Sequence, residues 1–197
     1  FVAEEGVSRL VIRGEMTEAD IVAGELENDR AMTNLRLGAL DDVSISVDTP
    51  IGTLRAYDWQ DGGERDTLRA PSVRNLRITG NGRENLNGDF EADILLTGAE
   101  DNGVSMRTLF VRGDVNDVEI ETPGDVYRMI IRGEASIVDA TIFGDLRVLR
   151  TGAASTMNIR ITGDSRFVNV DEWIGGEFIA STIRNFVVSG NRADNLD

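Results

Sequence analysis

The chain has 197 residues, of which 41% are apolar and 28% charged, a composition typical of folded soluble proteins. It contains no cysteine and no histidine, and all 20 basic residues are arginine. This excludes disulfides, cysteine catalysis, the usual serine–histidine hydrolases and lysine-based chemistry. The net charge of −15 argues against nucleic acid as a partner. No apolar run is long enough for membrane insertion.

One pattern recurs along the chain. An apolar residue is followed by two variable residues, a second apolar residue, one variable residue and a third apolar residue, with glycine usually two positions later. We expect units to start near Val7, Met32, Ile51, Val73, Met106, Val126, Leu146, Ser165 and Ile183. The spacings are 25, 19, 22, 33, 20, 20, 19 and 18 residues. The pattern predicts one short unit repeated nine times, with insertions in the first and fourth.

Each unit contains an apolar pair with the period of a β-strand, as at Leu10 and Ile12, and most contain a second alternating run, as at Val43, Ile45 and Val47. Turn sequences such as residues 122–125 and 162–164 separate the runs. The 21 glycines interrupt every candidate helix.

Two short strands bury too little surface to offset the entropy of ordering them, so each unit must stack on its neighbours. We therefore predict an all-β fold, a single parallel β-helix (β-solenoid) over residues 1–197 with nine coils of about 20 residues. The variable coil lengths favour a right-handed winding.

A longer repeat lies above the coil. Residues 57–86 match residues 170–196, with Trp59 aligned to Trp173, and residues 7–15 match residues 126–134. The offsets of 110 to 119 residues predict that five coils form one higher-order repeat, about 7–125, followed by an incomplete one, 126–197. Because residues 183–197 copy the start of a motif that residues 73–98 complete, we expect a segment of a longer array.

Three segments carry a family resemblance: residues 173–190, the longer version of the same motif at 59–80, and "GDFEADILLTG" at 88–98. They resemble the β-helical repeat regions of very large bacterial secreted and surface proteins, especially those of planctomycete-type genomes. The resemblance covers essentially the whole chain. It implies an extracellular or cell-surface location and a structural or adhesive role, and it brings no catalytic residues.

Arg112-Gly113-Asp114 is a cell-adhesion tripeptide in other contexts. The same coil position reads Arg-Gly-Glu at residues 13–15 and 132–134. This recurrence favours a structural interpretation, in which arginine lies on the outer strand face, glycine permits the corner and an acid follows it.

Arginines also recur at two outward positions of successive coils. One set is Arg36, Arg55 and Arg77, and the other is Arg74, Arg107, Arg147, Arg166 and Arg184. Because stacked like charges are unfavourable, we expect acids to interleave and form salt-bridged ladders. The alternative is a groove for a sulfated or acidic glycan.

Two further features each have a structural and a functional interpretation. Asp-rich turns at 88–93, 99–103 and 113–117 could hold calcium, but the known calcium-loop spacings are absent and Asp is a default turn residue. Trp59 and Trp173 could be sugar-stacking platforms, but their repetition before Gly-Gly favours packing over a coil edge. We assign no catalytic, cofactor-binding or metal-binding residues and no cofactor, with calcium as the open alternative.

We predict a non-catalytic structural or interaction module, a rigid spacer or adhesive segment of a large extracellular repeat protein such as a stalk, fibre or envelope layer. Its expected partners are flanking repeats of the same polypeptide, neighbouring copies or extracellular glycans. Recognition is expected in the insertions at 14–31, 80–90 and 98–105. The alternatives are a carbohydrate-active β-helix enzyme (lyase or glycosidase) and a glycan- or calcium-dependent binding module. Against an enzyme, the acids look scattered along the chain, not gathered on adjacent coils.

Overall fold

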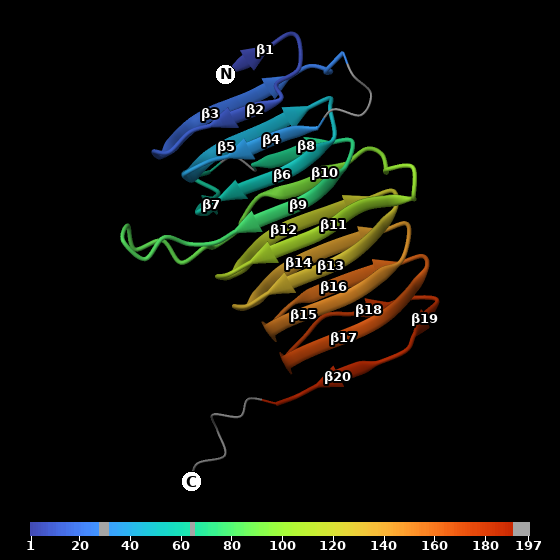
Figure 1. The fold of residues 1–197 in the computed structure, drawn as a ribbon. Coiled ribbons are helices and arrows are strands. Elements are labelled where there is room, and N and C mark those ends of the chain that lie inside the picture. The colour runs from blue at the N-terminus through green and yellow to red at the C-terminus, as the bar shows by residue number, and fades with distance from the viewer. Residues whose placement is uncertain (28–31, 64–65, 191–197) are drawn as a thin grey trace.

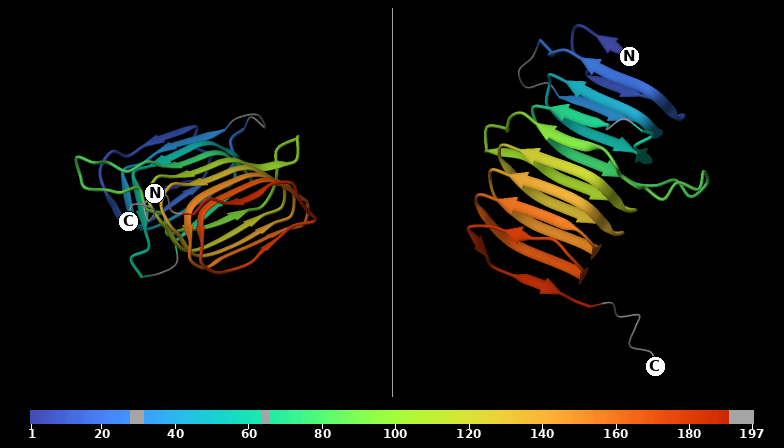
Figure 2. Two further views of the ribbon diagram at one scale, coloured as in Figure 1. Left: turned by 90° about the horizontal axis from the view of Figure 1, so that it is seen from below. Right: turned by 180° about the vertical axis from the view of Figure 1, so that it is seen from behind.

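The computed structural model describes residues 1–27, 32–63 and 66–190. These residues contain 20 strands and no helix, and the strands lie one above another from the N-terminus to the C-terminal coil (Figure 1). Seen along the stack, the coils are flattened loops that lie one behind the next (Figure 2). The predicted all-β solenoid of about nine coils is confirmed.

The strands form two parallel stacks, which we call face A and face B. Face A consists of β2 (Arg9–Val11), β4 (Thr33–Arg36), β6 (Ile51–Ala56), β9 (Val73–Ile78), β11 (Val104–Val111), β13 (Asp125–Ile131), β15 (Leu146–Ala154), β17 (Asp164–Trp173), β19 (Thr182–Ile183) and β20 (Phe186–Val188). Face B consists of β1 (Val2–Ala3), β3 (Met16–Ala23), β5 (Ala39–Val47), β7 (Asp58–Gln60), β8 (Thr67–Ala70), β10 (Asp93–Leu96), β12 (Val115–Thr122), β14 (Ala135–Ile142), β16 (Met157–Ile161) and β18 (Phe178–Ile179). Strands β15 and β17 belong mainly to face A but continue around the corner, so their last residues, Ala154 and Trp173, lie in line with β14 of face B. The buried side chains of both faces meet in one continuous core.

The pairing register of face A reproduces the predicted spacings. One inward column contains the second apolar residue of each coil: Leu10, Leu35, Leu54, Leu76, Leu109, Met129, Leu149, Val168 and Phe186. An inward column of face B contains Ile21, Ile45, Leu68, Ile94, Ile120, Ala140, Ile159 and Phe178. Because equivalent residues stack directly, every coil continues the core of the one before it.

A left-handed residue bends the strands of face B near their start. Glu18, Asp42, Asp117 and Ile137 occupy this position in β3, β5, β12 and β14, with φ between 48° and 58°. The bend turns the side chains on both of its sides toward the core, as at Val115 and Val118. Asp tolerates this conformation better than a β-branched residue does, so Ile137 is the strained member of the set.

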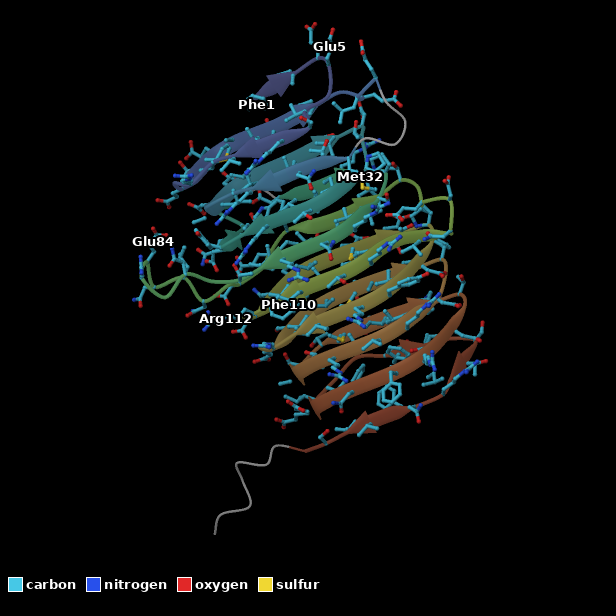
Figure 3. All side chains as sticks on the ribbon, in the orientation of Figure 1. Phe1, Glu5, Met32, Glu84, Phe110 and Arg112 are labelled. Carbon is cyan, nitrogen blue, oxygen red and sulfur yellow. The ribbon has the colours of Figure 1, made fainter. Side chains whose placement is uncertain are left out.

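The insertions leave the stack at its corners. Leu76 pairs directly with Leu109 although 33 residues separate them. Part of the extra length forms a loop closed by a bridge between Asn81 and Leu86, which carries Glu84 away from the coils (Figure 3). The predicted insertion at 14–31 is wrong in its first part, because Met16–Ala23 is strand β3 and pairs with β5. Residues 28–31 lie outside the described residues.

Glycine–acid pairs build the corner that follows face A. The carboxylate of Asp89 accepts a hydrogen bond from the backbone N–H of Asp114 at 2.8 Å, and the carboxylate of Asp114 accepts one from the N–H of Glu134 at 2.7 Å. A Cβ on Gly113 or Gly133 would collide with the carboxylate oxygen of the coil before it. Each carboxylate can therefore accept a hydrogen bond from the next coil only because a glycine, which has no side chain, precedes the residue that donates the N–H.

The corner that precedes face A uses the same device. Asp125 accepts a hydrogen bond from the N–H of Asp145 at 2.9 Å, and Asp145 accepts one from the N–H of Asp164 at 2.8 Å. Gly144 and Gly163 leave space for these two carboxylates. Recurrent Gly-Asp sequences thus link successive coils by backbone-to-carboxylate ladders.

Replacing Gly133 with alanine should destabilise the chain by about 1–3 kcal/mol, because the new methyl group has no space beside the Asp114 carboxylate and the Gly113 carbonyl. Gly14 occupies the same motif position in the first coil and meets no atom within 4 Å, so Gly14→Ala is the matched control. We expect it to change the free energy of unfolding by less than about 0.5 kcal/mol. Urea denaturation followed by circular dichroism measures both, and equal losses would contradict the corner mechanism.

Candidate functional site

The Arg112-Gly113-Asp114 tripeptide forms part of a corner. The N–H and the carboxylate of Asp114 are bonded to the coils on either side, to Asp89 and to Glu134. Arg112 is exposed and donates a 3.4 Å hydrogen bond to the carbonyl of Thr79. The tripeptide therefore has a structural role in the described chain, as its recurrence in other coils suggests.

Trp59 is not a sugar platform, because it is 0% exposed. Its ring meets Phe90 edge to face with centroids 5.7 Å apart. Its indole N–H lies 3.0 Å from both the carbonyl of Val43 and the carboxylate of Asp66. The packing interpretation holds, with the indole buried inside the coil.

Trp173 lies in the same column as Trp59, five coils further on, as their alignment in the sequence predicts. The column runs through Leu40, Trp59, Phe90, Val115, Ala135, Ala154 and Trp173. Trp173 is half-buried, and its ring lies 5.7 Å from that of Phe186 at a tilt of 58°. It therefore also packs against a neighbouring coil.

The burial of two carboxylates, Asp58 and Asp66, was not predicted from the sequence. Asp58 accepts hydrogen bonds from the N–H groups of Gly88 and Asp89 at 2.9 and 2.6 Å and from the side chain of Gln60 at 2.9 Å. Asp66 accepts bonds from Val43 N–H at 2.8 Å and from Trp59. Burial raises the pKa of both above the usual 3.8, although these hydrogen bonds act in the opposite direction.

Asp66→Asn should weaken the pH dependence of stability in the range above the ordinary carboxylate pKa of 3.8. Because burial raises the pKa of Asp66 in the folded chain, the folded chain binds a proton more tightly than the unfolded chain, and stability falls as pH rises through the raised pKa. Asparagine cannot bind or release a proton in this range, but its side-chain oxygen can still accept hydrogen bonds from Val43 and Trp59. Urea midpoints across this range measure the slope. Asp101→Asn, at an exposed position, is the charge-matched control, and an unchanged slope in Asp66→Asn would contradict the assignment.

Face A carries the arginines of this acidic protein. Its strands hold ten of the 20: Arg9, Arg36, Arg55, Arg74, Arg77, Arg107, Arg128, Arg147, Arg150 and Arg166. Arg13, Arg112 and Arg132 follow the ends of β2, β11 and β13, and Arg184 lies between β19 and β20. The acids in these strands are Asp125, Asp164, Asp171 and Glu172, all near strand ends. The middle of the outward-facing surface of face A is therefore strongly basic.

The predicted interleaving of acids with Arg36, Arg55 and Arg77 is not found among the described residues. The three side chains are stacked in register and exposed, and no acid of the described residues pairs with them. With Arg9, the first two border a shallow depression of about 240 Å³ that also contacts Asn34 and Thr53. A second depression, of about 170 Å³, lies between Arg147, Arg166 and Arg184 and is bordered by Asp145 and Asp164.

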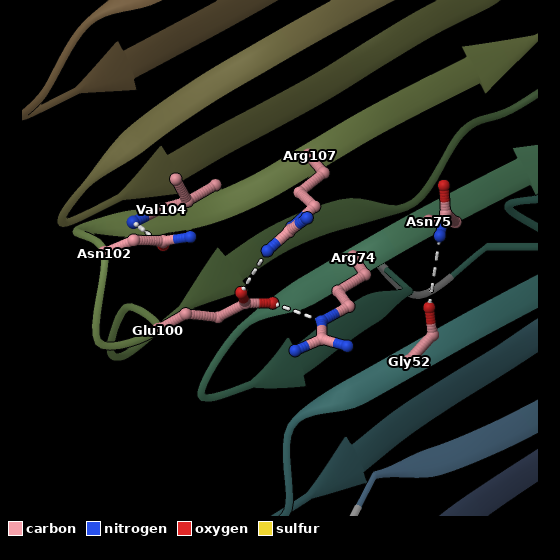
Figure 4. A network of polar contacts seen from close by, with 7 residues as sticks. All are labelled: Gly52, Arg74, Asn75, Glu100, Asn102, Val104 and Arg107. Atoms are coloured by element: carbon pink, nitrogen blue, oxygen red, sulfur yellow. Dashed lines mark hydrogen bonds and ion pairs between the residues drawn. The ribbon is translucent and has the colours of Figure 1, made fainter.

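A salt bridge does form where the 98–105 insertion returns to face A. Glu100 lies between Arg74, at 2.7 Å, and Arg107, at 2.9 Å (Figure 4). Burial acts to raise the pKa of Glu100, but the hydrogen bonds and charges of the two arginines outweigh it and hold the pKa below 4.5. This insertion therefore anchors itself to two coils.

Aromatic rings support two other arginines of face A. The guanidinium of Arg147 lies 3.8 Å from the ring centre of Tyr127, and that of Arg132 lies 5.3 Å from the ring centre of Phe110. These cation–π contacts hold the side chains against the sheet while leaving the charges exposed.

Face B carries the opposite charge. One outward column after the bend contains Asp20, Ser44, Thr67, Asp93, Glu119, Asp139, Asn158 and Glu177. The expected scatter of acids is therefore wrong on this face, because Asp93, Glu119 and Asp139 occupy adjacent coils. Several of these groups serve the fold: Asp93 accepts from Glu119 N–H at 2.7 Å and Asp139 from the Asn158 amide at 2.7 Å. A depression of about 340 Å³ lies along the last part of this column.

The candidate calcium turns contain no ligand cluster. In the part of the chain that the structure describes, no group of three acids is arranged to hold a metal ion. Asp89 and Asp114 are bonded to backbone N–H groups of the following coil, and Glu100 to arginines. Within the same residues, no helix has the length and hydropathy needed to cross a membrane.

Comparisons of the chain with protein-family models, with curated proteins and with solved structures gave no match. The function must therefore be argued from the coils, their two charged faces and their corners.

Proposed function

We propose that this chain is a non-catalytic structural and interaction module, a rigid spacer or adhesive segment of a large extracellular or cell-surface repeat protein. The observation that carries the proposal is the continuous stacking of about nine coils around one apolar core. At about 4.8 Å per coil, the module is roughly 43 Å long. The extracellular setting is supported by the resemblance of the motifs at 59–80 and 173–190.

Stiffness follows from how the coils are joined. Each coil is bonded to the next by parallel ladders on two faces and by carboxylates at the corners. Bending the stack would stretch all of these contacts on one side at once. A load applied along the axis is therefore shared among many hydrogen bonds.

The apolar column continues into the last described coil, where no described residue covers it. Ile183, Phe186 and Val188 occupy inward positions there, yet they are 39%, 42% and 49% exposed. In the preceding coil, Val168 and Val170 are fully buried. The last described coil thus exposes the same kind of apolar surface that each earlier coil presents to the next one.

Small-angle scattering tests the spacer proposal on the chain and on a tandem fusion of two copies joined in coil register. We expect a rod whose long dimension increases in proportion to the number of coils, with an unchanged cross-section. A fusion that collapses into a compact particle, or two modules joined by a flexible hinge, would contradict the proposal.

The acidic column of face B keeps one enzymatic alternative open. Glu119 and Asp139 lie on adjacent coils, and a pair of carboxylates is what a glycosidase requires. The function would then be hydrolysis of a polysaccharide lying across face B. Assays for new reducing ends and unsaturated products on a panel of polysaccharides test it, with Glu119→Gln as the inactive control.

A further inference from the structure

We propose that face A of one copy docks on face B of a second copy, so that modules associate side by side with their axes parallel. The inference goes beyond the proposed function, because a chain that stayed monomeric would still be a spacer. It is based on the separation of charge between two flat surfaces of one molecule. Face A displays ten arginines on its strands, whereas the strands of face B display only Arg69 and Arg160 among nine outward-facing acids.

The two faces share one spacing. Arg36, Arg55 and Arg77 stand on successive coils of face A, and Asp93, Glu119 and Asp139 stand on successive coils of face B. Both sets follow the strand separation of about 4.8 Å, because both belong to the same stack of coils. When two copies lie with parallel axes and are staggered by two coils, these three arginines therefore lie opposite these three acids. A second copy of this chain therefore supplies both the matching spacing and the opposite charge.

The size of the contact is sufficient for a specific interface. With a stagger of two coils, about seven coils overlap, so a contact roughly 34 Å long and, for a six-residue strand, about 20 Å wide covers roughly 670 Å². That is close to the roughly 800 Å² that each partner contributes to a standard protein interface. Exposed apolar side chains lie among the charges on both faces, including Phe167 and Val11 on face A and Val22, Ile137 and Ile179 on face B. Their burial would add to the charge pairing.

Docking also relieves a cost in the free molecule. Arg36, Arg55 and Arg77 repel one another at adjacent coils, with no acid of the described residues between them. Placing carboxylates of a neighbour opposite them converts that repulsion into pairing. The net charge of −15 opposes approach at long range, but at about 0.1 M salt the Debye length is about 10 Å, so the far faces are screened and touching pairs are not.

The contact is heterologous, because the two surfaces that meet are different. Each docked copy still presents a free face A on one side and a free face B on the other. Repetition of the same contact therefore produces an open row of parallel rods instead of a closed dimer. A layer or sheet of modules is the expected assembly.

Sedimentation velocity on the whole chain tests the proposal by a charge swap. We expect the wild-type chain to associate at about 0.1 M salt and to dissociate at about 1 M. The face A variant Arg36→Glu/Arg55→Glu/Arg77→Glu should lower the association constant at least about tenfold. A control with the same change in net charge, Arg69→Glu/Arg83→Glu/Arg160→Glu, leaves face A intact and makes face B more acidic, so it should associate at least as tightly as the wild type.

The decisive sample is a mixture. The face B variant Glu119→Arg/Glu121→Arg/Asp139→Arg should not associate alone, but it should bind the face A variant when the two are mixed. Circular dichroism and thermal midpoints confirm that each variant is folded. A monomeric wild type at about 0.1 M salt, or a mixture that does not associate, would overturn the proposal. Association only after addition of a sulfated glycan would assign face A to a polyanion instead.

Discussion

Replacing Leu109 with aspartate should remove most of the stability of the chain. Leu109 is fully buried in the fifth coil, and it stacks between Leu76 and Met129 in the inward column of face A. A carboxylate there would be a buried charge without a partner, which costs about 3–5 kcal/mol. A whole domain is stable by only about 5–15 kcal/mol. Because the fifth coil is central, we also expect the coils on either side to unfold separately.

The control uses the neighbouring residue of the same strand. Thr108 faces outward between Asn75 and Arg128, so Thr108→Asp places the same carboxylate on the basic surface. We expect it to change stability by less than about 0.5 kcal/mol. Urea denaturation followed by far-UV circular dichroism compares the two variants. Similar losses at residues 108 and 109 would show that the strand does not alternate between core and solvent.

Trp59→Ala should have the second largest effect, a loss of about 3–5 kcal/mol. The substitution removes the largest fully buried side chain of the described residues and its edge-to-face contact with Phe90. It also takes away the N–H that the buried Asp66 carboxylate accepts. Circular dichroism, not tryptophan fluorescence, should follow the unfolding, because one of only two tryptophans is lost.

Trp59→Phe separates packing from hydrogen bonding. Phenylalanine keeps a ring beside Phe90 but leaves the Asp66 carboxylate with the N–H of Val43 as its remaining donor. We expect a loss of about 1–3 kcal/mol, smaller than that of Trp59→Ala. A loss as large as that of the alanine variant would assign the stability to the hydrogen bond and not to the packed ring.

The coil architecture could be predicted because its signal is repeated. Leu76, Leu109 and Met129 return in step with a period-2 pattern, and alternation and repetition together allow little besides a stack of strands. The insertion expected at 14–31 overlaps strand β3, because Glu18 bends β3 and interrupts its alternation. A left-handed residue of this kind has no consistent sequence signature, since Asp117 and Ile137 occupy the same position.

The charged features were harder to predict because they depend on which coils meet. The sequence places Arg36, Arg55 and Arg77 at one repeat position but does not say whether acids lie between them. Asp58 and Asp66 look like ordinary turn acids, and only the stack shows that they accept backbone N–H groups from other coils. A formal charge of −15 likewise conceals a basic face.

The stack tolerates added length without losing alignment, as the direct pairing of Leu76 with Leu109 demonstrates. Residues that bulge out near Asn81 and Leu86 rejoin at the same height, so foreign peptides could be grafted there without displacing anything else. The length of the stack and the sequences of its loops can therefore change independently. Adding coils would extend the module, and replacing a loop would change what it displays.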